Sequence, residues 1–289
     1  MPAFVIDDPT PADPRRAWDR LDHAARGACF DNNASVADSA AQIAARNAAS
    51  ADYRATHAGS LDIRYGQGAR QAFDLYPAAD PAAPCLVFVH GGYWQRNARA
   101  DFACFAEGPN AAGWSVAMPG YTLAPDASLG AIVGEIGTAL DWLAEHGAKH
   151  RIGGSIVLAG WSAGAQLAAL HLGHRAVTAA LAISGVYDLA PIRETYLNEK
   201  LKLTDAEIET LSPLRLPVVQ KPMTIAYGSR ELPALVHDGR NLHASRSAAH
   251  ASGALLPVPG ADHFSILDEF RRHDGLLVRA AQDLLGGAR

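Results

Sequence analysis

The sequence contains few cysteines and no motif in which cysteines usually act together. Cys29, Cys85 and Cys104 are the only three, and none belongs to a CxxC motif. An odd number without close spacing speaks against a disulfide framework and against a zinc site built from cysteine thiolates. Cys85 lies at the start of an apolar run, which is typical of a small buried hydrophobic residue. We therefore expect a protein of the reducing cytoplasm.

Long apolar runs and concentrations of positive charge are also missing. The first residues contain no apolar segment of the signal-peptide type, and no later stretch approaches the roughly 18 apolar residues that cross a membrane. The 25 lysines and arginines stand against 30 aspartates and glutamates, which gives a net charge of −5. These features speak against a membrane or nucleic-acid partner, and they favour an unexported protein that acts on a small molecule.

The apolar content of the chain is large enough for one sizeable core. Hydrophobic residues make up 49% of the 289 positions, and charged residues make up 19%. Enzymes built on a central sheet often reach this length as one domain, and no repeat or low-complexity linker marks a boundary. We expect a single domain over residues 1–289, with an N-terminal helical arm over 1–57. Such an arm could fold over the main domain, help to cap its pocket, or join two subunits of a homodimer, and the sequence does not choose between these roles.

Short apolar segments alternate with helical patterns along most of the chain. Strands that are apolar throughout indicate an α/β fold with a mostly parallel sheet covered by helices on both faces. A polar, charged segment over 191–217 interrupts the pattern, and we interpret it as a small lid insertion. The predicted strands are 61–65 and 72–76 (a hairpin), 86–89, 115–118, 156–159, 179–183, 224–227 and 255–258, and the predicted helices include 39–54, 101–112, 129–145, 163–172 and 266–285.

One serine lies where a sharp turn between a strand and a helix is expected. Ser162 is the centre of GWSAG, which follows the strand sequence SIVLAG and precedes the helical sequence AQLAALHL. Flanking glycines permit a tight turn in which the serine holds a strained backbone and stands above the sheet. This context is typical of a nucleophile elbow. A Gly/Ser turn that merely links strand to helix is the alternative.

Two further residues follow late strands in the order that a serine nucleophile requires. A serine hydroxyl needs a base to accept its proton, and here an acid and then a histidine follow the serine. His263, in GADHF, is the expected base. Glu231, in GSRE, is the expected acid that orients the imidazole and stabilises its cation. Asp238 and Asp188 are the alternatives for the acid, and Asp262 is expected to be a turn residue.

A glycine pair after another strand is expected to bind the developing oxyanion. In HGGYW, the amides of Gly91 and Gly92 would act together with the amide of Ala163, and each such donor typically contributes about 3 kcal/mol. Glycine suits this position because the backbone must come close to the substrate carbonyl. The alternative is a simple glycine turn, and we expect His90 to hold the loop rather than to take part in catalysis.

Two histidine pairs have a spacing that could place both rings on one helix face. They are His146 with His150, and His171 with His174. No acidic or cysteine partner accompanies either pair near the strand ends, so we do not expect metal ligands there. We expect neither a metal nor a cofactor.

Six short motifs together resemble those of a known family. HGGYW, GYTLAP, GWSAGAQLA, SGVYDL, GSRE and GADHF are similar to motifs of the kynurenine formamidase (arylformamidase) branch of the α/β-hydrolases, which adjoins the hormone-sensitive-lipase-like esterases. The similarity extends from about Leu61 to the C-terminus. It implies hydrolysis of N-formyl-L-kynurenine to kynurenine and formate without a cofactor. It also places the nucleophile at Ser162, the base at His263 and the acid at Glu231.

The resemblance also concerns the aromatic residues around the site. Tyr93 and Trp94 would help to shape an aromatic pocket, or they could be core aromatics. Trp161 stands where the family often has histidine, so its indole would lie beside the substrate, and Glu231 stands where many members have aspartate. Two alternatives therefore stay open, namely a broad short-chain carboxylesterase and a non-catalytic ligand-binding protein of the same fold.

Overall fold

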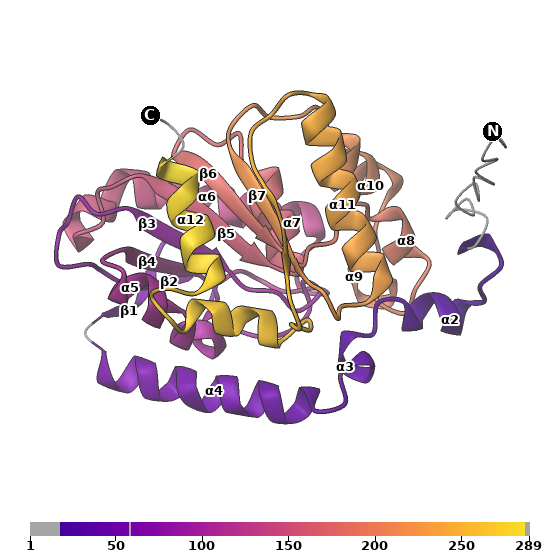
Figure 1. The fold of residues 1–289 in the computed structure, drawn as a ribbon, viewed down its shortest axis with the longest axis horizontal. Coiled ribbons are helices and arrows are strands. Elements are labelled where there is room, and N and C mark those ends of the chain that lie inside the picture. Colours follow the sequence, from indigo (N-terminus) through magenta and orange to yellow (C-terminus); the bar gives the residue numbers. More distant parts are fainter. Residues whose placement is uncertain (1–17, 58, 287–289) are drawn as a thin grey trace, which may run out of the picture.

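A computed structural model describes residues 18–57 and 59–286, and eight strands form its centre (Figure 1). The strands are β1 (Ser60–Arg64), β2 (Ala72–Tyr76), β3 (Cys85–Val89), β4 (Ser115–Pro119), β5 (Ile156–Trp161), β6 (Val177–Ile183), β7 (Met223–Gly228) and β8 (Leu255–Val258). They form one sheet in the order β1-β2-β4-β3-β5-β6-β7-β8. β2 is antiparallel to both of its neighbours, β1 and β4. The six other strands of the sheet, β4, β3, β5, β6, β7 and β8, are parallel to one another. The predicted hairpin and mostly parallel sheet are confirmed.

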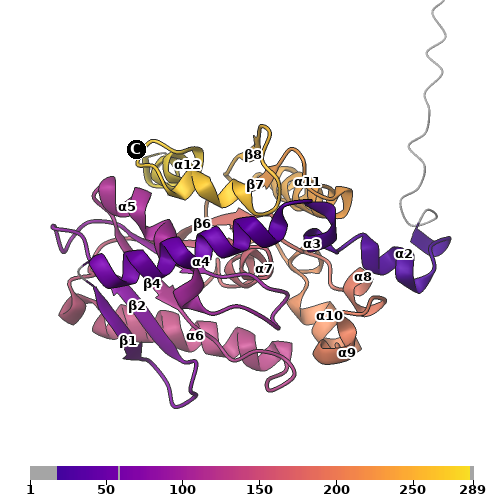
Figure 2. The same ribbon diagram turned by 90° about the horizontal axis from the view of Figure 1, so that it is seen from below.

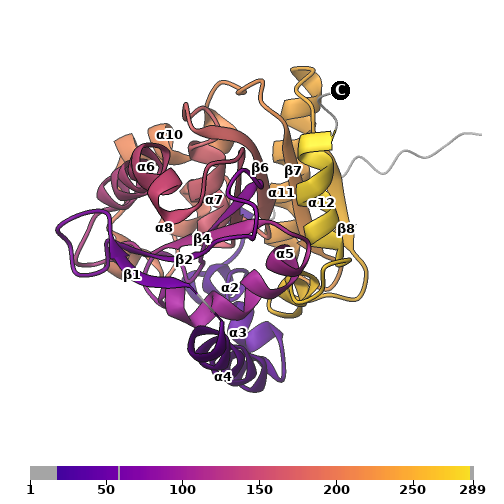
Figure 3. The same cartoon turned by 90° about the vertical axis from the view of Figure 1, so that its left-hand side faces the viewer.

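Helices cover both faces of the sheet, and each face carries its own hydrophobic core (Figure 3). Successive side chains of a strand point to opposite faces, so Leu158 of β5 belongs to one core and Val157 to the other. One face is covered by α6 (Leu129–His146), α7 (Ala163–Leu170) and α11 (Pro233–Ala248), and the other by η1 (Arg99–Ala106), α5 (Glu107–Ala111), η4 (Ser265–Phe270) and α12 (Leu276–Gly286). A short 3₁₀ helix, η2 (Gly147–His150), follows α6.

Two of the predicted helices are each divided into two pieces. The helix expected over 266–285 is wrong as one element, because η4 ends at Phe270 and α12 begins at Leu276. The amide of Leu276 donates to Glu269 Oε2 over 2.6 Å, which supplies a cap for the new helix. The helix expected over 101–112 is the 3₁₀ helix η1 followed by α5. Pro109 explains this division, because proline is tolerated only in the first turn of an α-helix.

The N-terminal arm lies across the outside of the layer formed by η1 and η4 (Figure 2). It consists of α2 (His23–Ala28), α3 (Asn32–Ser35) and α4 (Ser39–Thr56), and residues 1–17 of the predicted arm lie outside the described residues. Ser50 Oγ donates to the carbonyl of Asp101 over 2.8 Å. Arg54 forms an ion pair with the fully buried Asp74, which also pairs with Arg99 Nε at 3.1 Å. Hydrogen bonds and a buried charge cluster therefore fix α4 to the sheet domain.

The segment predicted as a lid folds into four short helical turns beside the carboxyl ends of the strands. These are α8 (Ala190–Arg193), α9 (Asn198–Leu201), α10 (Asp205–Leu211) and η3 (Pro213–Arg215). Thr204 and Glu207 form a capping box at the start of α10. Arg26 of the arm pairs with Glu194 at 2.7 Å, so the segment contacts the arm. Its movement as a lid stays a prediction. Across the described residues, no helix is both long and apolar enough to cross a membrane.

Candidate active site

Ser162 lies at the tip of a sharp turn between β5 and α7. Its φ of 58° and ψ of −121° are unusual for a residue with a side chain, and such strain occurs at functional sites. The flanking glycines make the turn possible. A Cβ on Gly160 would lie 2.0 Å from the Gly164 carbonyl oxygen, and one on Gly164 would lie 2.1 Å from the carbonyl oxygen of Val89. The turn therefore requires glycine at both positions.

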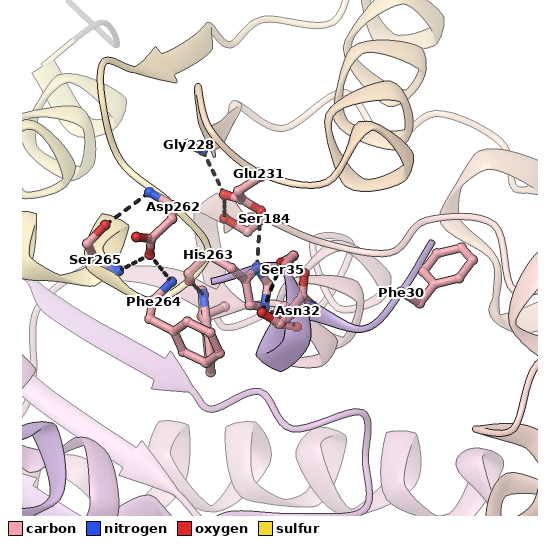
Figure 4. Close-up of polar contacts among 12 residues, drawn as sticks. Phe30, Asn32, Ser35, Ser184, Gly228, Glu231, Asp262, His263, Phe264 and Ser265 are labelled. Carbon is pink, nitrogen blue, oxygen red and sulfur yellow. Dashed lines mark hydrogen bonds and ion pairs between the residues drawn. The ribbon is translucent and has the colours of Figure 1, made fainter. Parts of the chain in front are cut away.

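His263 lies between Ser162 and Glu231 and contacts both. The Ser162 hydroxyl donates to His263 Nε2 over 3.1 Å. His263 Nδ1 donates to Glu231 Oε2 over 3.0 Å (Figure 4). Glu231 follows β7 and His263 follows β8, so the order of the parallel strands brings both residues to the edge where Ser162 stands. The side chain of Glu231 is 0% exposed and that of His263 is 4% exposed. The structure thus brings the three predicted residues together in a buried chain of hydrogen bonds.

Two further donors bind Oε1, the carboxylate oxygen of Glu231 that does not contact His263. Ser184 Oγ donates to Oε1 over 2.5 Å, and the Gly228 amide donates to the same oxygen over 2.7 Å (Figure 4). Sequence reasoning missed Ser184. Its available signal was its position directly after β6, within the motif SGVYDL. With His263, these donors fix the orientation of the carboxylate.

Neither alternative acid contacts the histidine. Asp238 Oδ2 accepts from the amides of Tyr187 and Asp188 over 2.7 and 3.2 Å, and burial raises its pKa to about 7. Asp188 instead forms an ion pair with Arg215 at 3.0 Å. Both aspartates therefore hold the loop after β6, and Glu231 is the carboxylate that meets the imidazole of His263.

Asp262 stabilises the turn that presents His263. Its Oδ1 accepts from the amides of Phe264 and Ser265 over 3.0 and 2.9 Å (Figure 4). Burial alone would raise the pKa of this carboxyl group. The hydrogen bonds from Ser265 and Phe264 outweigh burial and hold the pKa below its ordinary value. Gln42 of the arm also donates to Asp262 Oδ2 over 3.3 Å, so α4 contacts the histidine loop.

Trp161 supports the imidazole from the residue next to Ser162. Its Nε1 donates to the carbonyl oxygen of His263 over 2.9 Å, and the two rings lie 4.8 Å apart at an interplanar angle of 35°. Trp161 also lines the cavity beside Ser162. The tryptophan that departs from the family pattern thus contacts both the histidine loop and the space open to a substrate.

The glycine loop lies directly against Ser162. A Cβ on Gly91 would come within 2.8 Å of Ser162 Cβ, and Gly92 has a φ of 122°, which strongly favours glycine. The Gly91 carbonyl accepts from His90 Nδ1 over 2.9 Å and from Asn97 Nδ2 over 3.1 Å. Within 18–57 and 59–286, no acceptor takes the N–H groups of Gly91, Gly92 or Ala163. These amides are therefore available as donors.

His90 contacts this loop and does not contact Ser162. It is fully buried and stacks on Tyr121 with ring centroids 4.4 Å apart. Burial lowers the pKa of His90 to about 3, although the hydrogen bond to Gly91 opposes this shift. The imidazole is consequently neutral at pH 7 and positions the loop.

The two aromatic residues of the HGGYW motif differ, because Tyr93 lines the cavity beside Ser162 and Trp94 does not. The Tyr93 hydroxyl donates to the carbonyl of Phe30 over 2.7 Å and accepts from Asn32 Nδ2 over 3.1 Å. Both partners belong to the arm, and sequence reasoning missed them. Trp94 is fully buried, donates to Gln166 Oε1 over 3.1 Å, and is not among the residues that line either cavity near the site.

A cavity of about 80 Å³ lies beside Ser162 and His263. The arm supplies much of its wall, and Tyr196 of the 191–217 segment contributes to it as well. The other lining side chains include Phe30, Asn32, Ile43, Arg46, Tyr93, Trp161 and Phe264. The pocket beside the serine is therefore formed by three separate parts of the chain.

The histidine pairs considered as metal ligands have other contacts. His146 and His150 both pack against Trp142, with ring centroids 5.2 and 5.4 Å away. His171 Nδ1 lies 2.8 Å from the carbonyl of its own helix at Leu167. In the part of the chain that the structure describes, no three histidine, cysteine, aspartate or glutamate side chains are grouped to hold a metal ion.

Comparison with known proteins shows which family the chain resembles. The family model described as BD-FAE matches residues 73–208. The kynurenine formamidase of Drosophila melanogaster is 33% identical over 245 residues, which cover 77% of this chain and 80% of that protein. A crystal structure of a proposed thioesterase from Silicibacter sp. tm1040 has a TM-score of 0.80 and 28% identity, covering 88% of this chain and 98% of that one.

A fourth match concerns the fold alone. Esterase B from Lactobacillus rhamnosis has a TM-score of 0.65 at 20% identity, and the match covers 89% of this chain and 95% of that one. Together with the eight-stranded sheet, these matches confirm the α/β-hydrolase fold that the motifs predicted. The chain is a hydrolase, and it belongs to the kynurenine formamidase family.

Proposed function

We propose that Ser162, His263 and Glu231 form a catalytic triad that hydrolyses N-formyl-L-kynurenine to kynurenine and formate. The observation that carries the proposal is the buried chain of hydrogen bonds from the Ser162 hydroxyl through His263 to Glu231, over 3.1 and 3.0 Å. Membership of the kynurenine formamidase family supports the choice of substrate. The reaction needs water as its second reactant and no cofactor.

In the first half of the reaction, Ser162 Oγ attacks the formyl carbon while His263 Nε2 accepts the hydroxyl proton. The carbonyl oxygen becomes an oxyanion and accepts hydrogen bonds from the amides of Gly91, Gly92 and Ala163, which have no acceptor among the described residues. Glu231 stabilises the imidazolium without taking its proton. His263 then protonates the aryl nitrogen, and the C–N bond breaks. Kynurenine departs, and the formyl group remains bound to Ser162 as an ester.

In the second half, water replaces the amine as the partner of His263. His263 accepts a proton from the water, the resulting hydroxide attacks the formyl ester, and the serine oxygen leaves with that proton. Formate is released and Ser162 is restored. The cavity of about 80 Å³ beside the serine suits a small acyl group such as formyl, since a benzene-sized ligand needs roughly 150 Å³.

A broad short-chain carboxylesterase is the second candidate. The similarity to Esterase B and the small cavity beside the serine are its support, because short acyl esters need the same nucleophile and oxyanion donors. A non-catalytic ligand-binding role has less support. A protein of that kind would not need the complete and buried contact between Ser162, His263 and Glu231.

Steady-state kinetics separate the candidates. Purified protein should give a kcat/KM for N-formyl-L-kynurenine well above that for p-nitrophenyl acetate, and the Ser162→Ala variant should lose both activities while remaining folded. The reverse ranking would remove the formamidase proposal and favour the carboxylesterase. Hydrolysis of neither substrate by a folded protein would favour the non-catalytic role.

A further inference from the structure

The glycine loop after β3 contains a turn in which two residues with side chains hold left-handed backbones. The amides of Gln95 and Arg96 donate to the Gly92 carbonyl over 3.0 and 3.1 Å, and these bonds close the turn. Within the turn, Tyr93 and Trp94 have φ values of 50° and 57°. Residues other than glycine rarely adopt this conformation, and it persists only where other contacts hold it. The position of Gly92 therefore depends on what fixes these two side chains.

Different parts of the chain fix the two side chains. Trp94 Nε1 donates to Gln166 Oε1 over 3.1 Å, and Gln166 belongs to α7. Tyr93 is fixed by the arm, because its hydroxyl donates to the Phe30 carbonyl over 2.7 Å and accepts from Asn32 Nδ2 over 3.1 Å. Tyr93 is 6% exposed, and both of its partners are 4% exposed. The arm thus supplies the polar anchor for one of the two left-handed residues.

The arm residues that hold Tyr93 are themselves fixed. Ser35 Oγ donates to the Asn32 carbonyl over 2.9 Å (Figure 4). The Ala34 amide donates to Asp31 Oδ1 over 3.0 Å, which caps α3. Burial raises the pKa of Tyr93, so the hydroxyl keeps its proton and remains a donor. The contact between the arm and the glycine loop is therefore built from buried groups in defined positions.

We propose that the N-terminal arm is a positioning part of the active site, in which Phe30 and Asn32 act through Tyr93 on the glycine loop. Without the two hydrogen bonds to its hydroxyl, Tyr93 leaves its left-handed backbone more easily, and the turn that begins at Gly92 relaxes. The Gly92 amide then binds the oxyanion less well. The oxyanion exists only during reaction, so the loss concerns the transition state more than substrate binding. The inference rests on the proposed function for the role of the glycine loop.

Tyr93→Phe tests this role, because it removes only the hydroxyl. With p-nitrophenyl acetate, kcat should fall roughly 10-fold, the range for lost neutral hydrogen bonds, while KM changes little. Trifluoroacetophenone gives a second readout. Ser162 Oγ adds to its carbonyl carbon, the hydroxyl proton passes to His263, and the carbonyl oxygen becomes an oxyanion. The inhibition constant should rise by about the same factor as kcat falls. Both are measured on protein that circular dichroism shows to be folded.

Tyr53→Phe is the matched control. Tyr53 is 5% exposed, and its hydroxyl donates to Asn110 Oδ1 over 2.7 Å, so the substitution also removes a hydrogen bond between the arm and the main domain. Neither Tyr53 nor Asn110 lines the cavity beside Ser162. This variant should keep the wild-type kcat and inhibition constant, because its contact does not reach the glycine loop.

Asn32→Ala distinguishes positioning from contact with the substrate. Alone, it should lower kcat and weaken inhibition as Tyr93→Phe does. Added to Tyr93→Phe, it should change kcat by less than about twofold, because residues that act through one shared contact are not additive. A folded Tyr93→Phe protein with wild-type kcat and inhibition constant would overturn the proposal, and so would a full further loss in the double variant. If these effects are found but N-formyl-L-kynurenine is not hydrolysed, the proposed function fails and the positioning role stands.

Discussion

The substitution Glu231→Gln tests the role of the acid with almost no change in shape. In the structure, Oε1 accepts from Ser184 Oγ and from the Gly228 amide, while Oε2 accepts from His263 Nδ1. The Gly228 amide can only donate, so the glutamine oxygen must stay at that position. The glutamine NH₂ then faces His263 Nδ1, which must become an acceptor.

This change moves the proton of the neutral imidazole from Nδ1 to Nε2. A neutral His263 that accepts at Nδ1 carries its proton on Nε2, so it cannot take the proton of Ser162. The corresponding amide substitution in a serine protease triad lowers kcat by about 10⁴-fold, which equals about 5 kcal/mol of transition-state stabilisation. We expect a loss of the same order here, because the Glu231 side chain is fully buried.

The assay is the initial rate with p-nitrophenyl acetate, measured alongside circular dichroism and urea unfolding to establish that the variant is folded. Glu231→Asp serves as the control, since it keeps the charge and the acceptor character and should retain more activity than the amide. A folded Glu231→Gln protein with more than one-tenth of the wild-type kcat would refute the reasoning.

Three further substitutions test other contacts of the site and the fold. Ser184→Ala removes one donor from Glu231 and should lower kcat/KM about 10-fold in steady-state assays, consistent with a lost charged hydrogen bond of about 1.5 kcal/mol; an unchanged kcat/KM would contradict its positioning role. Arg54→Ala removes one of two cations from the buried Asp74 and should lower the free energy of unfolding in urea by about 3 kcal/mol. His90 has a folded pKa of about 3, below its unfolded value, so the unfolded chain binds more protons between these values. The stability that neutral His90 contributes should therefore be lost as pH falls below about 6.5, by up to roughly 1.4 kcal/mol per pH unit, and His90→Phe should flatten this dependence in urea unfolding at pH 7, 6 and 5.

Much of the sheet and of the candidate site could be predicted from the sequence because the signals are local. Strands β3 and β5 are apolar on both faces and are bounded by turns, so their positions are visible without knowledge of their neighbours. Ser162 follows β5 directly, and Glu231 and His263 lie in the loops that follow β7 and β8. Since the carboxyl ends of parallel strands share one edge of the sheet, their convergence followed from the fold.

The contacts that the sequence did not reveal join residues far apart along the chain. Helix α4 is rich in alanine, and its pattern does not show which surface it covers. Its attachment depends on the ion pair between Arg54 of α4 and the buried Asp74 of β2, and strand β1 separates these two residues in the sequence. The contacts of Asn32 with Tyr93, and of Ser184 with Glu231, likewise depend on tertiary placement and leave no periodic signal. The sequence offered a pocket-capping arm as one option, and the structure shows which arm residues line the pocket beside Ser162.

The central claim is that Ser162 is the nucleophile, and covalent labelling tests it most directly. A fluorophosphonate reacts with an activated serine by forming an O–P bond and releasing fluoride. Peptide mass mapping of the labelled protein should find the phosphonyl group on Ser162, with no label in the Ser162→Ala variant. Label on another residue, or hydrolysis that persists in the Ser162→Ala variant, would contradict the account.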